Sequence, residues 1–330
     1  MGGLAFALAF FVTVLTVPLA GRLARAGLVD IPTERSMHGS VVPRAGGAAM
    51  IVGVSLGAPV AVLAGADKTL LIIAGVAILL GAVGLLDDRF NLPGLPRMAA
   101  QVFVGAVILD LIADQSSGPG PGWPPAVGAA AILLWTLGIT NAVNFMDGVN
   151  GLTGTLTVVF CVHLALLGAP APVLVVPCVL LAAGTIGYLP ANFASGRVFL
   201  GDGGAYFIGA WLAAVVVLAV QRGLAPALVV APFAVYALDT SIALANRIRR
   251  GEALLLGHRD HVYQRVVLGG WSHTQSTLLV AVTASVCAGS AQLVDRGILA
   301  PLPGLVVGAS ALAGYLAAPR LQLRRQSLVT

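Results

Sequence analysis

The stretch LLIIAGVAILLGAVGLLDDRF, residues 70–90, decides the fold of this chain. Residues 70–86 are all apolar, and the run ends abruptly at Asp87 and Asp88. A hydrocarbon core of about 30 Å takes about 20 helical residues to cross, so such a run is typical of a transmembrane helix. The stretch therefore predicts a membrane span whose last turn carries two adjacent carboxylates.

The rest of the chain repeats this apolar pattern. Hydrophobic residues make up 58% and charged residues only 9%, with a mean hydropathy of +0.97, which is unlike a soluble domain. We therefore predict an all-α, polytopic membrane bundle of about eleven transmembrane helices, with ten as the alternative, in which residues 1–330 form a single domain. The apolar stretches start near Leu4, Gly46, Leu70, Met98, Ala126, Leu152, Pro172, Ala205, Leu224, Thr274 and Ile298.

The basic residues predict the orientation in the membrane. All of them except Lys68, Arg222 and Arg296 fall in loops that follow odd-numbered spans. Cytoplasmic loops collect Lys and Arg, so we expect the N-terminus outside, and the C-terminus and the polar loops on the cytoplasmic side. The net charge of +5 then reflects topology and contact with anionic lipid. No basic stripe is interleaved with aromatic residues, so nucleic acid is not an expected partner.

A few residues inside the spans also suggest roles. Asp239 is costly in lipid and should face a polar interior, and His163 should be a satisfied interior histidine. Gly53 and Gly57 form a small-residue repeat that favours helix packing. The three cysteines show no paired spacing, so we expect neither a disulfide framework nor a zinc site.

The first chemical motif is GLLDDRFNLPGLPR, residues 84–97. Neighbouring helical residues point in different directions, so Asp87 and Asp88 can do different jobs, one with a cation and one with a substrate. Asn91 and Arg97 follow closely. A solvated helix end is the alternative.

The second motif is GITNAVNFMDGVNGLTG, residues 138–154. Asn141, Asn144, Asp147 and Asn150 stand three residues apart, which stacks their side chains along one helical face or around a tight turn. Oxygen ligands of this kind suit magnesium together with phosphates. The alternative is a turn rich in Asn and Gly.

The third motif is LPANFASGRVFLGDGGAYFIG, residues 189–209, which presents Asn192, Phe199 and Asp202 before the eighth span. A carboxylate among glycines at a helix N-terminus can hold a cation while backbone amides face an anion. A simple helix cap is the plainer account.

The fourth motif is GHRDHVYQR, residues 257–265, in the loop after the ninth span. His258, Arg259, His261 and Arg265 form a group of donors fit for phosphate oxygens. A plain positive loop on the cytoplasmic side is the alternative.

Together with PTERSMHGSVVPRAGG, residues 32–47, these motifs resemble the polyprenyl-phosphate N-acetylhexosamine-1-phosphate transferases, which are of the glycosyltransferase family 4 type. The resemblance runs from about Arg22 to Ser276. It implies a bacterial inner-membrane enzyme that joins a sugar phosphate from a UDP-N-acetylhexosamine to an undecaprenyl or decaprenyl phosphate and releases UMP. This reaction would initiate cell-envelope glycan synthesis. UDP-GlcNAc is the expected donor and Mg²⁺ the expected cofactor, with Mn²⁺ as the alternative.

The resemblance also implies roles for matching residues. Asp202 resembles the magnesium-binding acid, with Asn144 beside it. Asp87 and Asp88 resemble the paired acids near the lipid phosphate, and Asp147 resembles a further active-site acid. The substrate-binding residues implied in this way are Asn91, Arg97, Asn150, Asn192, Phe199, His258, Arg259, His261 and Arg265, of which Phe199 would stack on uracil.

Two departures from the family pattern concern substrate contacts: the first affects the nucleoside, and the second, in the histidine loop of residues 257–265, leaves the sugar open. Asn150 stands where bacterial relatives usually carry Asp, and the usual His-x-His-His-Arg loop keeps only His261 and Arg265. Donors of the UDP-FucNAc or UDP-QuiNAc type, or UDP-MurNAc-pentapeptide, are the alternatives. The prenyl length, the glycan pathway and a homodimeric assembly are also left open.

The rival hypothesis from another class is an ion-coupled transporter or lipid flippase. Such a protein would carry acids near the middle of the membrane on broken helices. Here the acids stand almost entirely at predicted cytoplasmic span ends, which favours the transferase.

Overall fold

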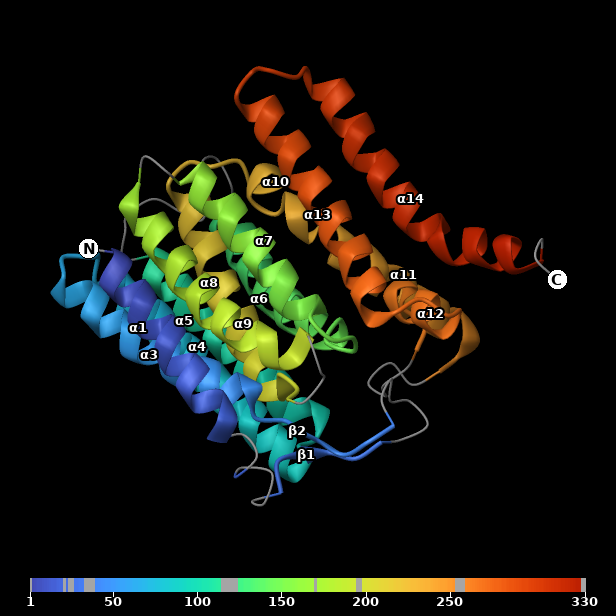
Figure 1. The fold of residues 1–330 in the computed structure, drawn as a ribbon. Helices are drawn as coiled ribbons and strands as arrows, with labels where there is room; N and C mark the ends of the chain where they lie inside the picture. The colour runs from blue at the N-terminus through green and yellow to red at the C-terminus, as the bar shows by residue number, and fades with distance from the viewer. Residues whose placement is uncertain are drawn as a thin grey trace.

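The computed structural model describes residues 2–19, 22, 27–32, 39–113, 124–168, 171–193, 198–252 and 259–327. These residues form a bundle of helices with one small pair of strands (Figure 1). The longer helices are α1 (Gly2–Thr16), α3 (Gly46–Leu63), α4 (Thr69–Phe90), α5 (Gly94–Ala113), α6 (Pro125–Phe145), α7 (Leu152–Leu167), α8 (Pro172–Phe193), α9 (Gly201–Gln221), α11 (Ala234–Arg250), α13 (His273–Asp295) and α14 (Pro301–Ser327). The short elements are η1 (Val17–Leu19), β1 (Val29–Asp30), β2 (Val42–Pro43), α10 (Pro226–Val229), η2 (Ala231–Phe233) and α12 (Val262–Leu268).

Helix α9 forms the centre of the bundle, and every residue from Gly203 to Ala219 is buried. Helix α4 crosses α9 closely, because a Cβ at Gly84 would overlap the backbone of Asp202. A Cβ at Gly47, at the start of α3, would overlap Gly204 in the same way. Small residues let helix backbones approach this closely within a membrane. These contacts bring the end of α4 and the start of α3 against the first turn of α9.

The expectation of a polytopic helical membrane protein is confirmed, but the expected eleven spans are met only in part. Among the described residues, seven helices are long and apolar enough to cross a membrane, namely α3, α4, α6, α8, α9, α13 and α14. Helices α1 and α7 are apolar but shorter. Helix α5 is not in this set.

The expected ninth span, which starts near Leu224, is not one continuous helix. The chain forms α10, then η2, and only then α11. Pro226 begins α10 and Pro232 lies within η2. Each proline removes one N–H donor from the helical ladder, which accounts for the division here, whereas α3, α8 and α14 accommodate a proline within a continuous helix.

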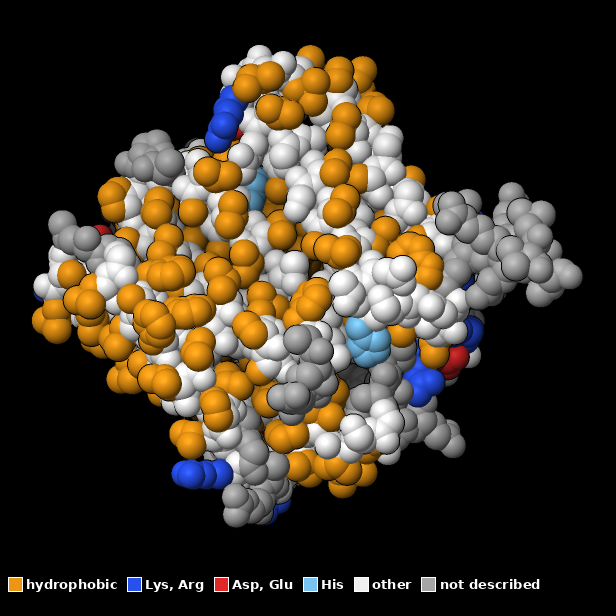
Figure 2. All heavy atoms as spheres, viewed as in Figure 1, with side chains coloured by type: hydrophobic (Ala, Val, Ile, Leu, Met, Phe, Trp, Pro, Cys, Tyr) orange, Lys and Arg blue, Asp and Glu red, His pale blue; other side chains and the backbone are white. Residues whose placement is uncertain are grey.

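The outside of the bundle is apolar. Figure 2 shows hydrophobic side chains over most of one face, with the visible charged side chains near its rim. Helix α13 packs against α7, and α14 packs against α13 on the outer side of the bundle (Figure 1). Several large apolar side chains on α14 are exposed, among them Leu302 and Leu305, each 70% exposed. Such surface suits contact with lipid rather than water.

Two expectations about interior residues are confirmed, for the paired glycines and for His163. Gly53 packs against α1 at Thr13, and Gly57 packs against α8 at Leu180. The imidazole of His163 is buried, with Nε2 2.8 Å from a backbone oxygen and Nδ1 2.9 Å from the amide nitrogen of Gln292. The three cysteines are free and buried.

Candidate active site

Asp87 lies in the last turn of α4 and is paired with Arg97. Asn91 ends the helix in the left-handed conformation, with φ of 51°, so the chain turns back into α5 and returns Arg97 to α4. Arg97 Nη1 donates to Asp87 Oδ2 at 2.7 Å, and the Leu92 N–H donates to Asp87 Oδ1 at 2.8 Å. The hydroxyl of Tyr206, one turn after Asp202 on α9, also donates to Oδ2 at 3.4 Å. The Asp87 carboxylate is therefore held on both of its oxygens.

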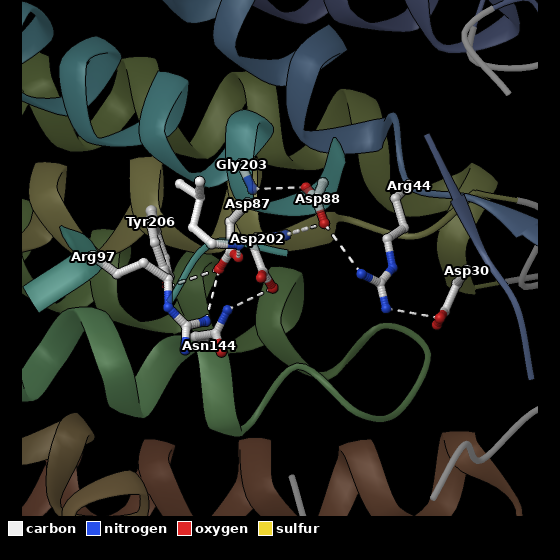
Figure 3. Close-up of polar contacts among 10 residues, drawn as sticks. Asp30, Arg44, Asp87, Asp88, Arg97, Asn144, Asp202, Gly203 and Tyr206 are labelled. Atoms are coloured by element: carbon white, nitrogen blue, oxygen red, sulfur yellow. Dashed lines mark hydrogen bonds and ion pairs between the residues drawn. The ribbon is translucent and has the colours of Figure 1, made fainter. Parts of the chain in front are cut away.

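Asp88 points away from Asp87 and toward the start of α9 (Figure 3). Its Oδ1 accepts the Asp202 N–H at 3.1 Å and its Oδ2 accepts the Gly203 N–H at 3.0 Å. The first N–H groups of a helix have no partner within the helix, so Asp88 serves as a cap supplied by another helix. Arg44 Nη1 also lies 3.4 Å from Asp88 Oδ1, while the Asp88 side chain is fully buried.

Asp202 meets Asn144, which comes from the end of α6. Asn144 Nδ2 donates to Asp202 Oδ1 at 2.8 Å. Figure 3 shows Asp87, Asp88 and Asp202 between two arginines, with Arg97 on one side and Arg44 on the other. The structure therefore brings together Asp87, Asp88, Asn144, Asp202 and Arg97, which the sequence singled out in three separate motifs.

The donor atoms of this cluster fit a magnesium ion in their chemistry. Within the described part of the chain, no three His, Cys, Asp or Glu side chains converge into a ready metal site. Asp202 and Asn144 nevertheless offer carboxylate and amide oxygens, and Asp87 and Asp88 add negative charge around them. Mg²⁺ prefers oxygen ligands and is commonly bound through one or two carboxylates plus substrate phosphates.

The turn between α6 and α7 is tied to the end of α8. Gly151 has a positive φ of 81°, which glycine adopts without strain, and its N–H donates to Asn192 Oδ1 at 2.6 Å. The Asn192 amide nitrogen donates to the Val198 carbonyl oxygen at 3.0 Å. The buried Asn192 thus uses both ends of its amide on backbone, which is an arrangement for positioning two loops.

Asp147 lies in the same turn and is half-buried. Burial raises the pKa of its carboxyl to about 6, and the Thr153 hydroxyl acts in the opposite direction. Gly148 is next to it, and a Cβ there would overlap the hydroxyl of Tyr263. That hydroxyl donates to the Phe145 carbonyl oxygen at 3.0 Å, so the histidine loop packs directly against this turn.

Backbone hydrogen bonds of Phe199 and its neighbour join the third motif to the motif of residues 32–47. The Phe199 N–H donates to the Pro43 carbonyl at 2.8 Å, and its own carbonyl accepts the Gly46 N–H at 3.0 Å. The Gly47 N–H donates to the Leu200 carbonyl at 2.9 Å. The Phe199 side chain remains partly exposed at the entrance to α9.

Asn91 and Asn150 occupy different surroundings. Asn91 is exposed, and its N–H donates to the Asp87 carbonyl at 2.8 Å to close α4. The Asn150 N–H donates to His273 Nδ1 at 3.3 Å, and its carbonyl accepts the Thr277 hydroxyl at 2.9 Å. The backbone of Asn150 therefore joins the second motif to the start of α13.

Asp239, buried in α11, accepts hydrogen bonds from the histidine loop and from α14. It therefore faces a polar interior, as predicted. Asp239 is 1% exposed; its Oδ1 accepts the Val262 N–H at 3.0 Å and its Oδ2 accepts the Tyr315 hydroxyl at 2.8 Å. His261 is also buried, with Nδ1 3.5 Å from Asp239 Oδ2. The ring of His261 is stacked on that of Tyr263. Its expected contact with a substrate phosphate stays a prediction.

The other members of the histidine loop are spread out. Arg259 is half-buried and Arg265 is exposed on α12. His258 lies outside the described residues. Arg250, in the last turn of α11, pairs with Asp260 at 2.6 Å and with Glu252 at 2.9 Å.

Two residues of the cluster, Arg44 and Tyr206, were not selected from the sequence. Arg44 lies in the motif of residues 32–47, of which 33–38 are outside the described part. Its position two residues before Gly46 and Gly47 was a usable signal, because glycines allow a close approach between segments. Tyr206 stands four residues after Asp202 and so shares its helix face, which was a signal too.

Comparison with known proteins gives a consistent set of relatives. The pattern of glycosyl transferase family 4 matches residues 70–220, which run from α4 to α9. The chain is 30% identical over 291 residues to a probable undecaprenyl-phosphate N-acetylglucosaminyl 1-phosphate transferase of Bacillus subtilis, with 82% of this chain and 80% of the relative covered.

Two further relatives carry similar names. A decaprenyl-phosphate N-acetylglucosaminephosphotransferase of Mycolicibacterium smegmatis is 29% identical over 344 residues, covering 86% of this chain and 80% of the relative. An undecaprenyl-phosphate alpha-N-acetylglucosaminyl 1-phosphate transferase of Escherichia coli is 26% identical over 312 residues, covering 88% and 83%. The similarity therefore extends well beyond the matched segment of 70–220.

Proposed function

This chain belongs to glycosyl transferase family 4, and on that premise we propose that it transfers N-acetylglucosamine 1-phosphate from UDP-GlcNAc to a polyprenyl phosphate and releases UMP. The observation that carries the proposal is the meeting of Asp87, Asp88, Asn144 and Asp202 between two arginines. The choice of N-acetylglucosamine is supported by the names of the relatives. The acceptor is an undecaprenyl or a decaprenyl phosphate.

The charges of the site suit a reaction between two phosphate-bearing substrates. A phosphate monoester carries roughly −2 near pH 7, so the two substrates together bring about four negative charges. Arg97 and Arg44 each pair with one carboxylate of the cluster. Their remaining N–H donors can meet phosphate oxygens, since a guanidinium has five such donors.

A magnesium ion would complete this balance of charge. Asp202 and Asn144 would hold it, with Asp87 alongside, and when bound it supplies neutralisation of charge on the phosphates. The support for magnesium is the oxygen chemistry of these side chains and the membership of the family.

The reaction we propose is a single in-line displacement. An oxygen of the lipid phosphate attacks the phosphorus that bears the sugar, and the bond from that phosphorus to the oxygen of UMP breaks, so UMP leaves with the electron pair. The lipid phosphate needs no base, because its second pKa is near 6 and it is mostly dianionic at pH 7. Asp88 therefore positions the start of α9 rather than taking a proton, as its two bonds to backbone N–H groups indicate.

The location of the cluster also favours the transferase over a transporter. Asp87 and Asp88 lie in the last turn of α4, Asp202 in the first turn of α9, and Asn144 near the end of α6. These are ends of apolar helices rather than their middles, where an ion-coupled transporter would carry its acids. We propose that this end faces the cytoplasm, in line with the positions of the arginines.

The test is a reconstituted reaction. Purified protein, undecaprenyl phosphate and Mg²⁺ are incubated with a panel of UDP-N-acetylhexosamines, and UMP and the lipid product are followed by mass spectrometry. We expect UMP and lipid-linked GlcNAc 1-phosphate with UDP-GlcNAc, loss of both with EDTA, and recovery on adding Mg²⁺. Asp202→Ala should be inactive, whereas Asp295→Ala, at an exposed carboxylate beyond the other end of the bundle, should behave as wild type.

Each outcome decides a different part of the proposal. Product from another donor alone would correct the sugar and keep the reaction. Turnover that EDTA leaves unchanged would remove magnesium from the mechanism. No UMP from any donor, with protein that still shows cooperative thermal unfolding, would overturn the transferase.

A further inference from the structure

Arg44 is held in place more firmly than a surface arginine. Its backbone N–H donates to the Leu28 carbonyl at 2.9 Å, which extends the pairing of β1 with β2. Its guanidinium is fixed from one side by Asp30, with Nη2 2.7 Å from Oδ1. The backbone of Arg44 and the end of its side chain are therefore both anchored.

The guanidinium faces the cluster of acids, but the oxygens of Asp88 already have other hydrogen-bond donors. Asp88 already accepts two backbone N–H groups from α9, at 3.1 and 3.0 Å, and its contact with Arg44 is longer, at 3.4 Å. Burial alone would lower the pKa of Arg44, but the carboxylates of Asp30, Asp88 and Asp202 outweigh it and raise that pKa. Arg44 thus stays charged within the field of Asp202.

Arg44 is also open to a ligand. Its side chain is 31% exposed, whereas Asp88 beneath it is fully buried. Two of its five N–H donors point to carboxylates, which leaves the others for a further acceptor on the exposed side. A Cβ at Gly201, the first residue of α9, would meet both the Arg44 Cβ and the Asp88 carboxylate, so Arg44 stands directly in front of the first turn of α9.

We propose that Arg44, held by Asp30, binds a phosphate oxygen of a substrate in front of the first turn of α9. The proposal rests on the proposed function for the identity of that substrate. The phosphate belongs either to the lipid monoester or to the diphosphate of the nucleotide sugar. Asp30 is a positioning residue in this arrangement, because it reaches the phosphate only through Arg44.

Binding measurements test this without relying on turnover. The affinities of detergent-solubilised protein for undecaprenyl phosphate and for UDP-GlcNAc are measured separately by titration calorimetry for wild type, Arg44→Ala, Arg44→Lys and Asp30→Asn. Arg44→Ala should weaken one of the two ligands by about tenfold or more, because a hydrogen bond to a charged group is lost. Arg44→Lys should recover part of the loss, since it keeps the charge but not the forked donors.

The ligand that weakens identifies the source of the phosphate. Asp30→Asn should weaken the same ligand, and it should have no further effect in the Arg44→Ala background. Arg222→Ala is the matched control, because this exposed arginine lies at the opposite end of α9 and should leave both affinities unchanged.

Wild-type affinity for both ligands in Arg44→Ala and in Arg44→Lys would overturn the proposal, even if turnover fell, because Arg44 would then act only through Asp88. Equal effects of Asp30→Asn in both backgrounds would remove Asp30 from the arrangement. A failure of the proposed function can be told apart from these binding results, because wild type would then release no UMP from any donor in the reconstituted reaction.

Discussion

Asp88, in the last turn of α4, accepts the backbone N–H of Gly203 in the first turn of α9 at 3.0 Å. Its other oxygen accepts the Asp202 N–H at 3.1 Å. Asp88 therefore fixes the backbone of Asp202 and Gly203. In this way it sets the position of the Asp202 carboxylate. The adjacent acids of the first motif have different surroundings, since Asp87 is paired with Arg97 instead.

This division of roles predicts the behaviour of Asp88→Asn. An amide has only one oxygen to accept with, so one of the two α9 N–H groups loses its acceptor, at a cost of about 1–3 kcal/mol. We expect kcat to fall by at least about tenfold but to remain measurable, by the same fraction across the pH range, while Asp202→Asn is inactive. The measurement is UMP release as a function of pH. A loss in Asp88→Asn that disappears at high pH would show that Asp88 takes a proton.

The close crossing of α4 and α9 predicts that Gly84→Ala is damaging. The added Cβ meets the backbone of Asp202, which cannot move aside as a flexible side chain could. Overpacking of this kind costs about 1–3 kcal/mol and should also displace the acids. We expect a lower Tm and lower activity. Gly75→Ala is the matched control on the same helix, because Gly75 has open space around it and should tolerate the change.

Much of the site could be predicted from the sequence because its residues stand at the ends of apolar runs. Asp87 and Asp88 close one run and Asp202 opens another, and such ends lie at a membrane surface whatever the packing. The interior position of Asp239 followed from the cost of a carboxylate in lipid, and it is confirmed. The sequence did not show that Asp87 pairs with Arg97 while Asp88 caps α9, because the capping depends on how α4 and α9 cross.

The remaining differences also arise from tertiary packing. The ninth span was expected to be continuous because its residues are apolar, although Pro226 and Pro232 gave the signal for a break. The contact between His261 and Asp239 could not be predicted from the sequence, because Asp239 stands 22 positions earlier in the chain and also bonds Tyr315 on α14. Hydropathy and loop composition carry no information about contacts of that kind.

The raised pKa of Asp147 predicts a pH-dependent stability. Its carboxyl takes a proton in the folded protein with a pKa of about 6, compared with 3.8 for the ordinary group. The folded state therefore binds the proton more tightly, and this contribution to stability is lost as pH rises from about 4 through about 6. Asn resembles the protonated form, so Asp147→Asn should gain Tm relative to wild type at about pH 7.5 and not at about pH 4.

Tryptophan fluorescence during heating in detergent measures this difference. Asp295→Asn, at an exposed carboxylate, should shift Tm equally at both pH values. A difference in Tm between Asp147→Asn and wild type that is the same at both pH values would show that Asp147 is not the titrating group.

The Asp239 contacts predict coupling between α11, α12 and α14. Asp239→Asn keeps one acceptor oxygen, so while it holds the Val262 N–H its amide nitrogen faces Tyr315, whose hydroxyl must then accept and loses the carboxylate to which it donates in wild type. We expect a loss of about 1–3 kcal/mol, larger than that of Tyr315→Phe, which leaves the Val262 bond intact. In the Tyr315→Phe background the amide nitrogen can face the phenyl ring, so Asp239→Asn should cost less there than in wild type. The free energies of unfolding of the two single variants and the double variant give this comparison. Strictly additive losses would show that Asp239 and Tyr315 do not couple α11 to α14.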